Sequence, residues 1–358
     1  MTLRMSMFAS HVGGLSSLLY RLNRIDRARR RFRRVALALV AVALSGCVQS
    51  LNDLGVASHD IPPKLLGSMR AKGMKPESPV LVRIFKMESE LEIWKVDGSG
   101  RYALLKIYPM CRWSGKLGPK SKTGDRQAPE GFYRVSMAGL NPKSQFYLSF
   151  NLGYPNRLEA ALGYSGEALM VHGACSSSGC FALTDQGVGE IYAVVEKALK
   201  GGQLAFQVQA YPFRMTPQNL AAHRDDPNVA FWRNLKEGYD IFDLRRREPR
   251  VAACGSKYVF DAEFKDGDPA DPLAACPVRI DRSDPAVVAK ASADDQKYLE
   301  LAAESFTPLA YQDGGMHPSF RALLEENGDV QLAEKVSVIK YPISRPVAAL
   351  ADPFDGSK

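Results

Sequence analysis

Short runs rich in apolar residues recur along the chain between positions 80 and 210, and apolar and polar residues alternate in the last of them, at 204–210. Alternation with a period of two is typical of strands that bury one face. A Gly- and Ser-rich turn at 97–100 separates two of these runs, as expected between neighbouring strands. Strands are therefore predicted at 80–87, 91–96, 102–108, 132–135, 146–152, 169–172 and 204–210.

Helical periodicity is clearest directly after position 183. Thr184 can cap a helix whose apolar residues recur every three or four positions, and Gly201 would end it. A second helix is predicted at about 228–244, and amphipathic segments follow at 295–306 and 320–326. We therefore expect a mainly β fold with helices, of the α+β class, followed by a helical C-terminal extension over residues 263–358.

The first 46 residues have the pattern of an export signal. An arginine-rich block precedes an apolar run at 35–44, and the four residues that end at Cys47, Leu-Ser-Gly-Cys, resemble a lipobox. The apolar run is too short to span a bilayer, so we expect this signal peptide to be removed. Cleavage before Cys47 would leave a lipid-bearing cysteine that anchors the chain to a membrane. An ordinary soluble export signal is the alternative.

Residues 47–79 contain four prolines and three glycines without sustained periodicity, which predicts a tether. Such a tether would let an anchored domain reach a target away from the membrane. Val48 is not the acidic residue associated with retention in the inner membrane. We therefore expect a lipoprotein of the outer membrane that faces the periplasm.

The excess of basic over acidic residues lies within the first 46 residues. The full sequence has 47 Lys and Arg residues against 39 Asp and Glu residues. The first 46 residues hold nine Arg and one Asp, so the remaining 312 residues carry 38 charges of each sign. A mature chain without formal net charge gives no reason to expect binding to a nucleic acid.

Export places the cysteines in an oxidising compartment, where they can pair. Of the six, one is assigned to the lipid and one to chemistry, which leaves four cysteines with three possible connectivities. We favour a disulfide between Cys254 and Cys276, because both lie in a loop-rich stretch. Cys111 and Cys175 would then pair or remain thiols.

The segment from His172 to Cys180 carries the most specific chemistry. Small residues separate the two and allow the backbone to turn tightly. A thiol becomes a good nucleophile when a neighbouring imidazole or an oriented dipole favours the thiolate. Gly179 also leaves room for a substrate carbonyl beside main-chain N–H groups. The segment therefore predicts an enzyme that transfers acyl groups through a thiol.

Structural roles compete with this interpretation. Cys180 could form a disulfide with Cys175, since exported cysteines usually pair. His172 could join both cysteines in a zinc site, but no fourth ligand lies nearby, so no metal or cofactor is predicted. Tyr154 and Arg157 could line a substrate groove or could serve packing alone.

Four stretches carry a resemblance to a known family. They are 117–120 (Leu-Gly-Pro-Lys), 128–133 (Ala-Pro-Glu-Gly-Phe-Tyr), 149–156 (Ser-Phe-Asn-Leu-Gly-Tyr-Pro-Asn), and the His-Gly and Ser-x-Gly-Cys of 172–180. In this order they resemble the L,D-transpeptidase catalytic domain of the YkuD type, in particular its YafK-like branch. The resemblance covers about residues 80–260. It implies an L,D-transpeptidase-like β-sandwich with a helix after the nucleophile, and we place this domain at 80–262.

The resemblance also implies roles for individual residues. Cys180 would be the nucleophile and His172 the base that takes its proton. The carbonyl of Gly173 would orient the imidazole, in the place of a triad's third member. The N–H groups of Gly179 and Cys180 would stabilise the oxyanion.

Members of this family attack the carbonyl at the L-centre of the diamino acid in the peptidoglycan stem peptide, and an amine or water resolves the acyl-enzyme. The YafK-like branch is associated with detaching wall-linked proteins, which implies hydrolysis. Ser178 stands where many members have histidine, and Ala182 stands where they usually have arginine. These departures favour a hydrolase over a transpeptidase that forms cross-links or attaches proteins. A non-catalytic envelope lipoprotein that binds the wall is a further alternative.

Overall fold

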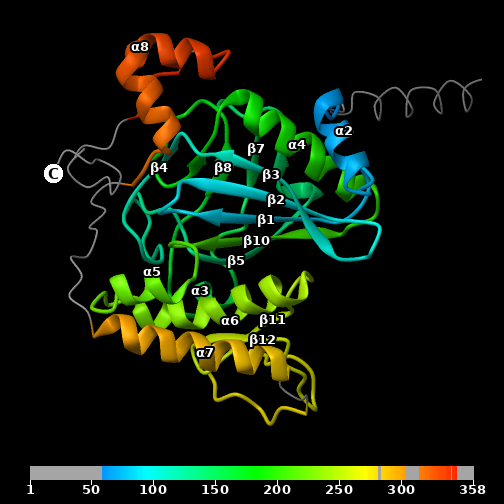
Figure 1. Ribbon diagram of the computed structural model, residues 1–358, viewed down its shortest axis with the longest axis vertical. Helices are drawn as coiled ribbons and strands as arrows, with labels where there is room; N and C mark the ends of the chain where they lie inside the picture. The colour runs from blue at the N-terminus through cyan, green and yellow to red at the C-terminus, as the bar shows by residue number, and fades with distance from the viewer. Residues whose placement is uncertain (1–58, 281–283, 304–313, 340, 345–358) are drawn as a thin grey trace, which may run out of the picture. The chain divides into compact units, whose positions relative to one another are not determined.

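The computed structural model describes residues 59–280, 284–303, 314–339 and 341–344, which belong to one compact unit (Figure 1). The predicted signal peptide and Cys47 lie outside these residues. The described strands form two five-stranded sheets and a separate hairpin, and helices pack around them. This arrangement confirms the predicted α+β class.

The first sheet has the strand order β3-β2-β1-β10-β5, in which only β1 and β10 run parallel. Every residue of β1 is buried, because both faces of the sheet are covered. Leu81 packs against Phe242 of a long helix on one face, and Val82 belongs to the main core on the other. The strands are β1 (Val80–Phe85), β2 (Glu90–Val96), β3 (Tyr102–Pro109), β5 (Gly131–Ser136) and β10 (Ala205–Tyr211).

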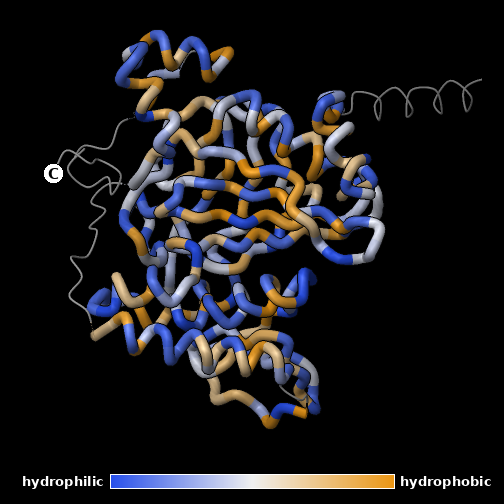
Figure 2. The backbone as a smooth tube through the Cα atoms, viewed as in Figure 1, coloured by the Kyte–Doolittle hydropathy of each residue, from blue (hydrophilic) through white to orange (hydrophobic). Residues whose placement is uncertain are grey.

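The second sheet has the order β4-β9-β8-β7-β6 and packs against the first. Phe150 of β7 and Phe206 of β10 meet with ring centroids 5.5 Å apart, and both belong to the main hydrophobic core. In Figure 2 the strands at the centre of the view are predominantly hydrophobic. The strands are β4 (Arg112–Trp113), β6 (Leu140–Asn141), β7 (Ser149–Asn151), β8 (Met170–His172) and β9 (Phe181–Ala182).

The helix predicted after Cys180 is present as α4 (Asp185–Lys200) and contacts strands of both sheets. The hydroxyl of Thr184 accepts a hydrogen bond from the Gly187 N–H, which caps the helix as predicted. The second predicted helix is α6 (Val229–Arg245), which covers the outer face of the first sheet. Shorter helical segments are η1 (Met137–Gly139), α3 (Arg157–Ala161) and α5 (Pro217–Ala222).

The prediction of a tether is wrong for residues 59–79. Helix α2 (Pro63–Ala71) lies in this range, and Leu65 and Met69 enter the main core together with Ile61 and Met74. Proline at the first helical position suits a helix start, because its missing N–H would have no intrahelical partner there. Residues ahead of β1 therefore belong to the described fold and contribute to its main core.

The predicted helical extension contains α7 (Pro285–Ala302) and α8 (Pro318–Val336). Helix α7 contacts α5 and α6, and ion pairs such as Lys236–Asp294 join it to α6. Residues just before α8 pair with β4 through a bridge between Gly315 and Trp113. The hairpin of β11 (Val251–Cys254) and β12 (Lys257–Phe260) completes the described elements. No helix among the described residues is long and apolar enough to cross a membrane.

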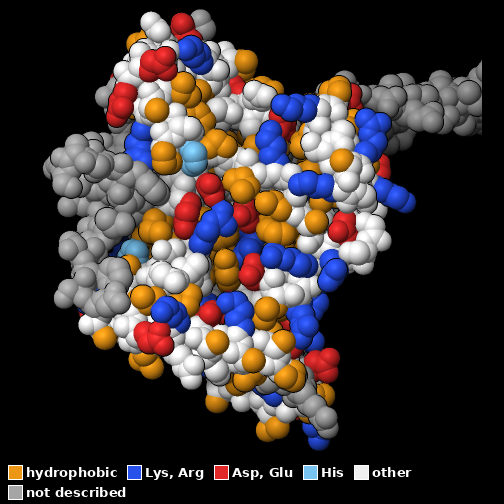
Figure 3. All heavy atoms as spheres, viewed as in Figure 1, with side chains coloured by type: hydrophobic (Ala, Val, Ile, Leu, Met, Phe, Trp, Pro, Cys, Tyr) orange, Lys and Arg blue, Asp and Glu red, His pale blue; other side chains and the backbone are white. Residues whose placement is uncertain are grey.

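Basic and acidic side chains are interspersed over the face of the molecule shown in Figure 3. This mixture agrees with the balanced charge of the chain after its first 46 residues.

Candidate active site

The candidate site is built on an eight-residue loop, 173–180, that joins two neighbouring parallel strands, β8 and β9. Connections between parallel strands usually need a dozen residues or more. The short return is made possible by Ala174 and Cys175, which both adopt left-handed backbone angles, with φ values of 68° and 48°. Such angles cost roughly 1–2 kcal/mol per residue for side chains other than glycine. The loop therefore needs support from its surroundings.

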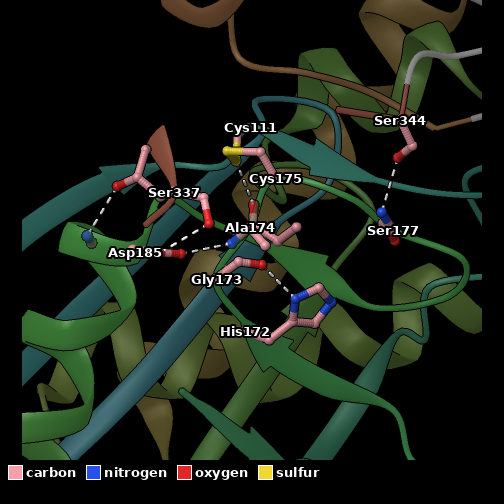
Figure 4. Close-up of a disulfide and its surroundings, with 12 residues drawn as sticks. Cys111, His172, Gly173, Ala174, Cys175, Ser177, Asp185, Ser337 and Ser344 are labelled. Atoms are coloured by element: carbon pink, nitrogen blue, oxygen red, sulfur yellow. Dashed lines mark hydrogen bonds between the residues drawn. A yellow bond between two sulfur atoms is a disulfide. The ribbon is translucent and has the colours of Figure 1, made fainter. Parts of the chain in front are cut away.

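A disulfide and a buried carboxylate supply this support (Figure 4). Cys175 is bonded to Cys111, which lies directly before β4, and both are almost fully buried. Asp185, the first residue of α4, accepts a hydrogen bond from the Ala174 N–H at 3.0 Å. A side chain at Gly173 would approach Asp185 Oδ1 to 2.5 Å, so only glycine fits there. The two left-handed residues are thus held on both sides.

His172 is the last residue of β8 and is buried, with 4% of its surface exposed. Its Nδ1 lies 2.6 Å from the carbonyl oxygen of Gly173. A carbonyl can only accept, so Nδ1 carries the proton and Nε2 keeps its lone pair. Burial lowers the pKa of His172, against a smaller opposing effect of the bond to Gly173. The imidazole is therefore a neutral base at physiological pH.

Cys180 is the only described cysteine outside a disulfide, and it is partly exposed. Strand β9, which pairs with the strand that ends at His172, begins one residue after Cys180, and the Cys180 thiol donates to the carbonyl oxygen of Ala168 at 3.8 Å. Burial raises the pKa of the Cys180 thiol, although the Met170 backbone and the charge of Lys120 act in the opposite direction. The thiol is therefore predominantly protonated at neutral pH.

The raised pKa of Cys180 predicts how its alkylation depends on pH. Because thiolate is the reactive form, the rate with iodoacetamide should reach half of its plateau at a higher pH than that of an ordinary thiol, which is half ionised at about pH 8.5. Peptide mapping would assign the modified residue, and glutathione would provide the reference curve. A rate that is already constant between about pH 5 and 7 would instead reveal a thiolate paired with imidazolium, contrary to this expectation.

The two N–H groups that are proposed to bind an oxyanion already donate hydrogen bonds within the protein. Those of Gly179 and Cys180 point to the hydroxyl oxygen of Ser177, at 3.4 Å and 3.1 Å. The Ser177 hydroxyl donates to the Cys180 carbonyl at 2.7 Å and also lies 3.1 Å from the hydroxyl of Ser114. A substrate oxygen could use these donors only after the Ser177 hydroxyl has turned away.

The hydrogen bonds described for the side chains of Tyr154 and Arg157 are made with residues other than Cys180. The Tyr154 hydroxyl donates to the carbonyl of Lys120 at 3.0 Å, so the ring supports the residue whose charge acts on Cys180. Arg157 donates to the carbonyl oxygens of Pro269 and Ala270. It also lines a cavity of about 320 Å³ whose described lining includes neither His172 nor Cys180. The described hydrogen bonds of Arg157 are thus made with the loop at residues 269–270.

The predicted disulfide between Cys254 and Cys276 is present, and Cys111 and Cys175, which were expected to pair or to remain thiols, are also bonded. The bond between Cys111 and Cys175 excludes the alternative in which Cys175 pairs with Cys180. Cys254 ends β11, so the other disulfide fastens the hairpin to the loop that follows it.

The structure adds three residues that the sequence did not single out. Asp185 accepts a hydrogen bond from the loop after His172, and the Ser177 hydroxyl accepts hydrogen bonds from the N–H groups of Gly179 and Cys180. The ring centroid of Phe146 lies 4.9 Å from that of His172. The acidic residue at the start of a helix was the one available signal, but a helix dipole alone explains such a residue.

Comparison with known proteins identifies the family. Two curated proteins named "Putative L,D-transpeptidase YafK", from Escherichia coli strain K12 and from O157:H7, are each 42% identical to the chain over 227 residues. These residues are 63% of this chain and 90% of either relative. The chain therefore belongs to the YafK-like L,D-transpeptidase family. No family model matches the chain.

Solved structures show more distant likenesses. The helical cell shape determining protein Pgp2 from Campylobacter jejuni is 16% identical, with a TM-score of 0.32, over 67% of this chain and 78% of that protein. Bd1075 from Bdellovibrio bacteriovorus is 14% identical, with a TM-score of 0.27, over 49% of this chain and 74% of that protein. The family assignment rests on the YafK sequences alone.

Proposed function

We propose that the protein is a cysteine-dependent peptidoglycan enzyme that cleaves at the diamino acid of the stem peptide and thereby releases wall-linked protein. One observation carries this proposal: a neutral imidazole, fixed by the Gly173 carbonyl at the end of β8, is followed eight residues later by a free thiol directly before the neighbouring strand β9. Membership of the YafK-like L,D-transpeptidase family supports peptidoglycan as the substrate.

In the first step, the sulfur of Cys180 attacks the carbonyl carbon at the L-centre of the diamino acid. The thiol proton moves to Nε2 of His172, and a carbon–sulfur bond forms. The bond between that carbon and the amine of the attached protein then breaks, and His172 gives its proton to the leaving amine. A thioester on Cys180 and a free protein amine result.

In the second step, water attacks the thioester carbon. His172 takes a proton from the water, the carbon–sulfur bond breaks, and the proton returns to the sulfur. The stem peptide leaves with a carboxyl group, and the thiol and the neutral imidazole are restored. The N–H groups of Gly179 and Cys180 would stabilise the negative oxygen in both steps once the Ser177 hydroxyl has turned.

Transfer to an amine is the second candidate, and the name of the E. coli relatives favours it. In that case a second stem peptide or a protein takes the place of water, and the product is a cross-link or an attachment. The acylation step is identical in both cases, so only the products distinguish them. A non-catalytic wall-binding lipoprotein would yield neither product.

We further propose that the chain is exported and carries lipid on Cys47, which holds it at the periplasmic side of the envelope, in the outer membrane. The Arg-rich start, the apolar run and the Leu-Ser-Gly-Cys sequence support this location. Labelling with radioactive palmitate tests whether Cys47 carries lipid. The wild-type protein should be labelled, and Cys47→Ala should not be.

Purified sacculi that carry covalently attached protein test the reaction. We expect the enzyme to release protein into solution, and we expect Cys180→Ala to release none. Ser176→Ala, at a half-buried position in the same loop, is the matched control and should behave as wild type. New cross-linked muropeptides would indicate transfer instead. Release that persists in Cys180→Ala, or no change in the sacculi at all, would contradict the proposal.

A further inference from the structure

A segment from the C-terminal extension reaches the candidate active site. We call residues 337–339 and 341–344, which follow α8, the C-terminal strap. Figure 4 shows Ser337 and Ser344 of the strap on either side of the loop that follows His172. Only Ser337 and Ile343 of the strap are buried, while Val338 is 73% exposed. Burial of apolar surface alone therefore gives little reason for the strap to lie there.

Asp185 joins the strap to the active-site loop. Its Oδ1 accepts from the Ala174 N–H at 3.0 Å. Its Oδ2 accepts from the Ser337 hydroxyl at 2.9 Å and from the Val338 N–H at 2.7 Å. Asp185 is 5% exposed, and hydrogen bonds to a buried charge are among the stronger ones. The strap and the loop are thus coupled through one carboxylate.

Aromatic contacts connect the strap to the imidazole. The ring of Tyr341 lies edge-on to Phe146, with centroids 5.0 Å apart. Phe146 in turn lies 4.9 Å from the ring of His172. Phe146 is thus held between Tyr341 on one side and the imidazole on the other.

The end of the strap contacts the other half of the site. The hydroxyl of Ser344 accepts a hydrogen bond from the Ser177 N–H at 2.9 Å. Ser177 is the residue whose own hydroxyl binds the N–H and carbonyl groups of Cys180. Ile343 packs in the small core that contains the Cys111–Cys175 disulfide. The strap therefore touches the supports of both His172 and Cys180.

We propose that the C-terminal strap is a positioning element of the active site, in which Tyr341 holds the His172 ring through Phe146 and Ser344 holds the Ser177 amide beside Cys180. This inference rests on the proposed function, because it assigns the strap to the acylation step. Tyr341 and Ser344 are positioning residues and touch no reacting atom. Small misplacements of reacting groups are costly, and a shift of about 1 Å can slow a reaction 100-fold.

The test is the acylation of the full-length protein by a carbapenem, followed by intact mass at increasing inhibitor concentrations. We expect Tyr341→Ala to lower the maximal acylation rate roughly 10- to 100-fold, with little change in the concentration that gives half of it. Tyr341→Phe keeps the ring and should restore the wild-type rate. Ser344→Ala should slow acylation independently. Val338→Ala is the matched control, since its side chain is exposed and its N–H remains.

The outcomes separate the strap from the chemistry. A wild-type protein that forms no adduct overturns the proposed function and the strap's role with it. Wild-type acylation that Tyr341→Ala and Ser344→Ala both leave unchanged overturns the strap alone. A Tyr341→Phe variant as slow as Tyr341→Ala would also contradict the role given to the ring. Thermal unfolding of each variant shows whether slower acylation is caused by loss of the folded structure. If Tyr341→Ala does not fold, the acylation rate of Ser344→Ala tests the role of the strap.

Discussion

Cys180→Ala is expected to abolish covalent capture of a carbapenem. The intact wild-type protein should gain the mass of one inhibitor molecule, because its thiol opens the lactam ring and keeps the acyl group. Loss of a catalytic nucleophile has cost about a millionfold in other enzymes, so no adduct should be detectable in the variant. Cys180 is the only described cysteine outside a disulfide, so no other described thiol can take its place.

The fold of the Cys180→Ala variant should be unaffected, because the side chain is partly exposed and only one sulfur atom is lost. Ser176→Ala, from the same loop, should still be captured fully. An adduct on Cys180→Ala, or one mapped to another residue of the wild type, would remove Cys180 from its proposed role.

Replacing Cys111 and Cys175 together by serine should cost about 4 kcal/mol of unfolding free energy. The disulfide spans 64 positions, and closing a loop of that length restricts the unfolded chain by about this amount. The loss should also release the left-handed turn after His172, so acylation should slow along with it. Guanidinium unfolding and carbapenem acylation measure the two effects.

The second disulfide provides the control for this experiment. Cys254 and Cys276 are 22 positions apart, so their replacement should cost about 3 kcal/mol. Their bond fastens the hairpin of β11 and β12 rather than the active-site loop, so acylation by the folded protein should be unchanged. Equal acylation rates in both double variants would show that the Cys111–Cys175 bond does not position the site.

The elements that were predicted correctly are those whose formation is determined by residues close together in the sequence. Short runs rich in apolar residues located the strands of the first sheet, and the Thr184 cap and apolar stripe located α4. The loop of 172–180 could also be recognised, because its composition reflects a backbone constraint within the loop itself. The cysteine count left three connectivities for four cysteines, and the loop-rich stretch that holds Cys254 and Cys276 favoured the pair that the structure shows.

The elements that the sequence missed depend on tertiary contacts. Helix α2 has only two buried residues of its own, so its apolar pattern is too sparse to recognise. The strand predicted at 146–152 is confined to Ser149–Asn151, and Tyr147 before it has a φ of 74°. This turn is what leaves Phe146 beside His172. The strap contacts residues about 150–195 positions away, and nothing local in its sequence indicates its partners.

A defined fragment of the wall provides the most direct measurement. Purified protein would be mixed with a disaccharide tetrapeptide, and the reaction would be quenched in acid. The protein would then be digested, and mass spectrometry would give the mass of the peptide that contains residue 180. We predict a thioester on Cys180 with the mass of the fragment less its terminal residue, and no such species in His172→Gln. An unmodified Cys180 peptide while the fragment is being cleaved would contradict the claim that this thiol, with His172 as its base, carries the reaction.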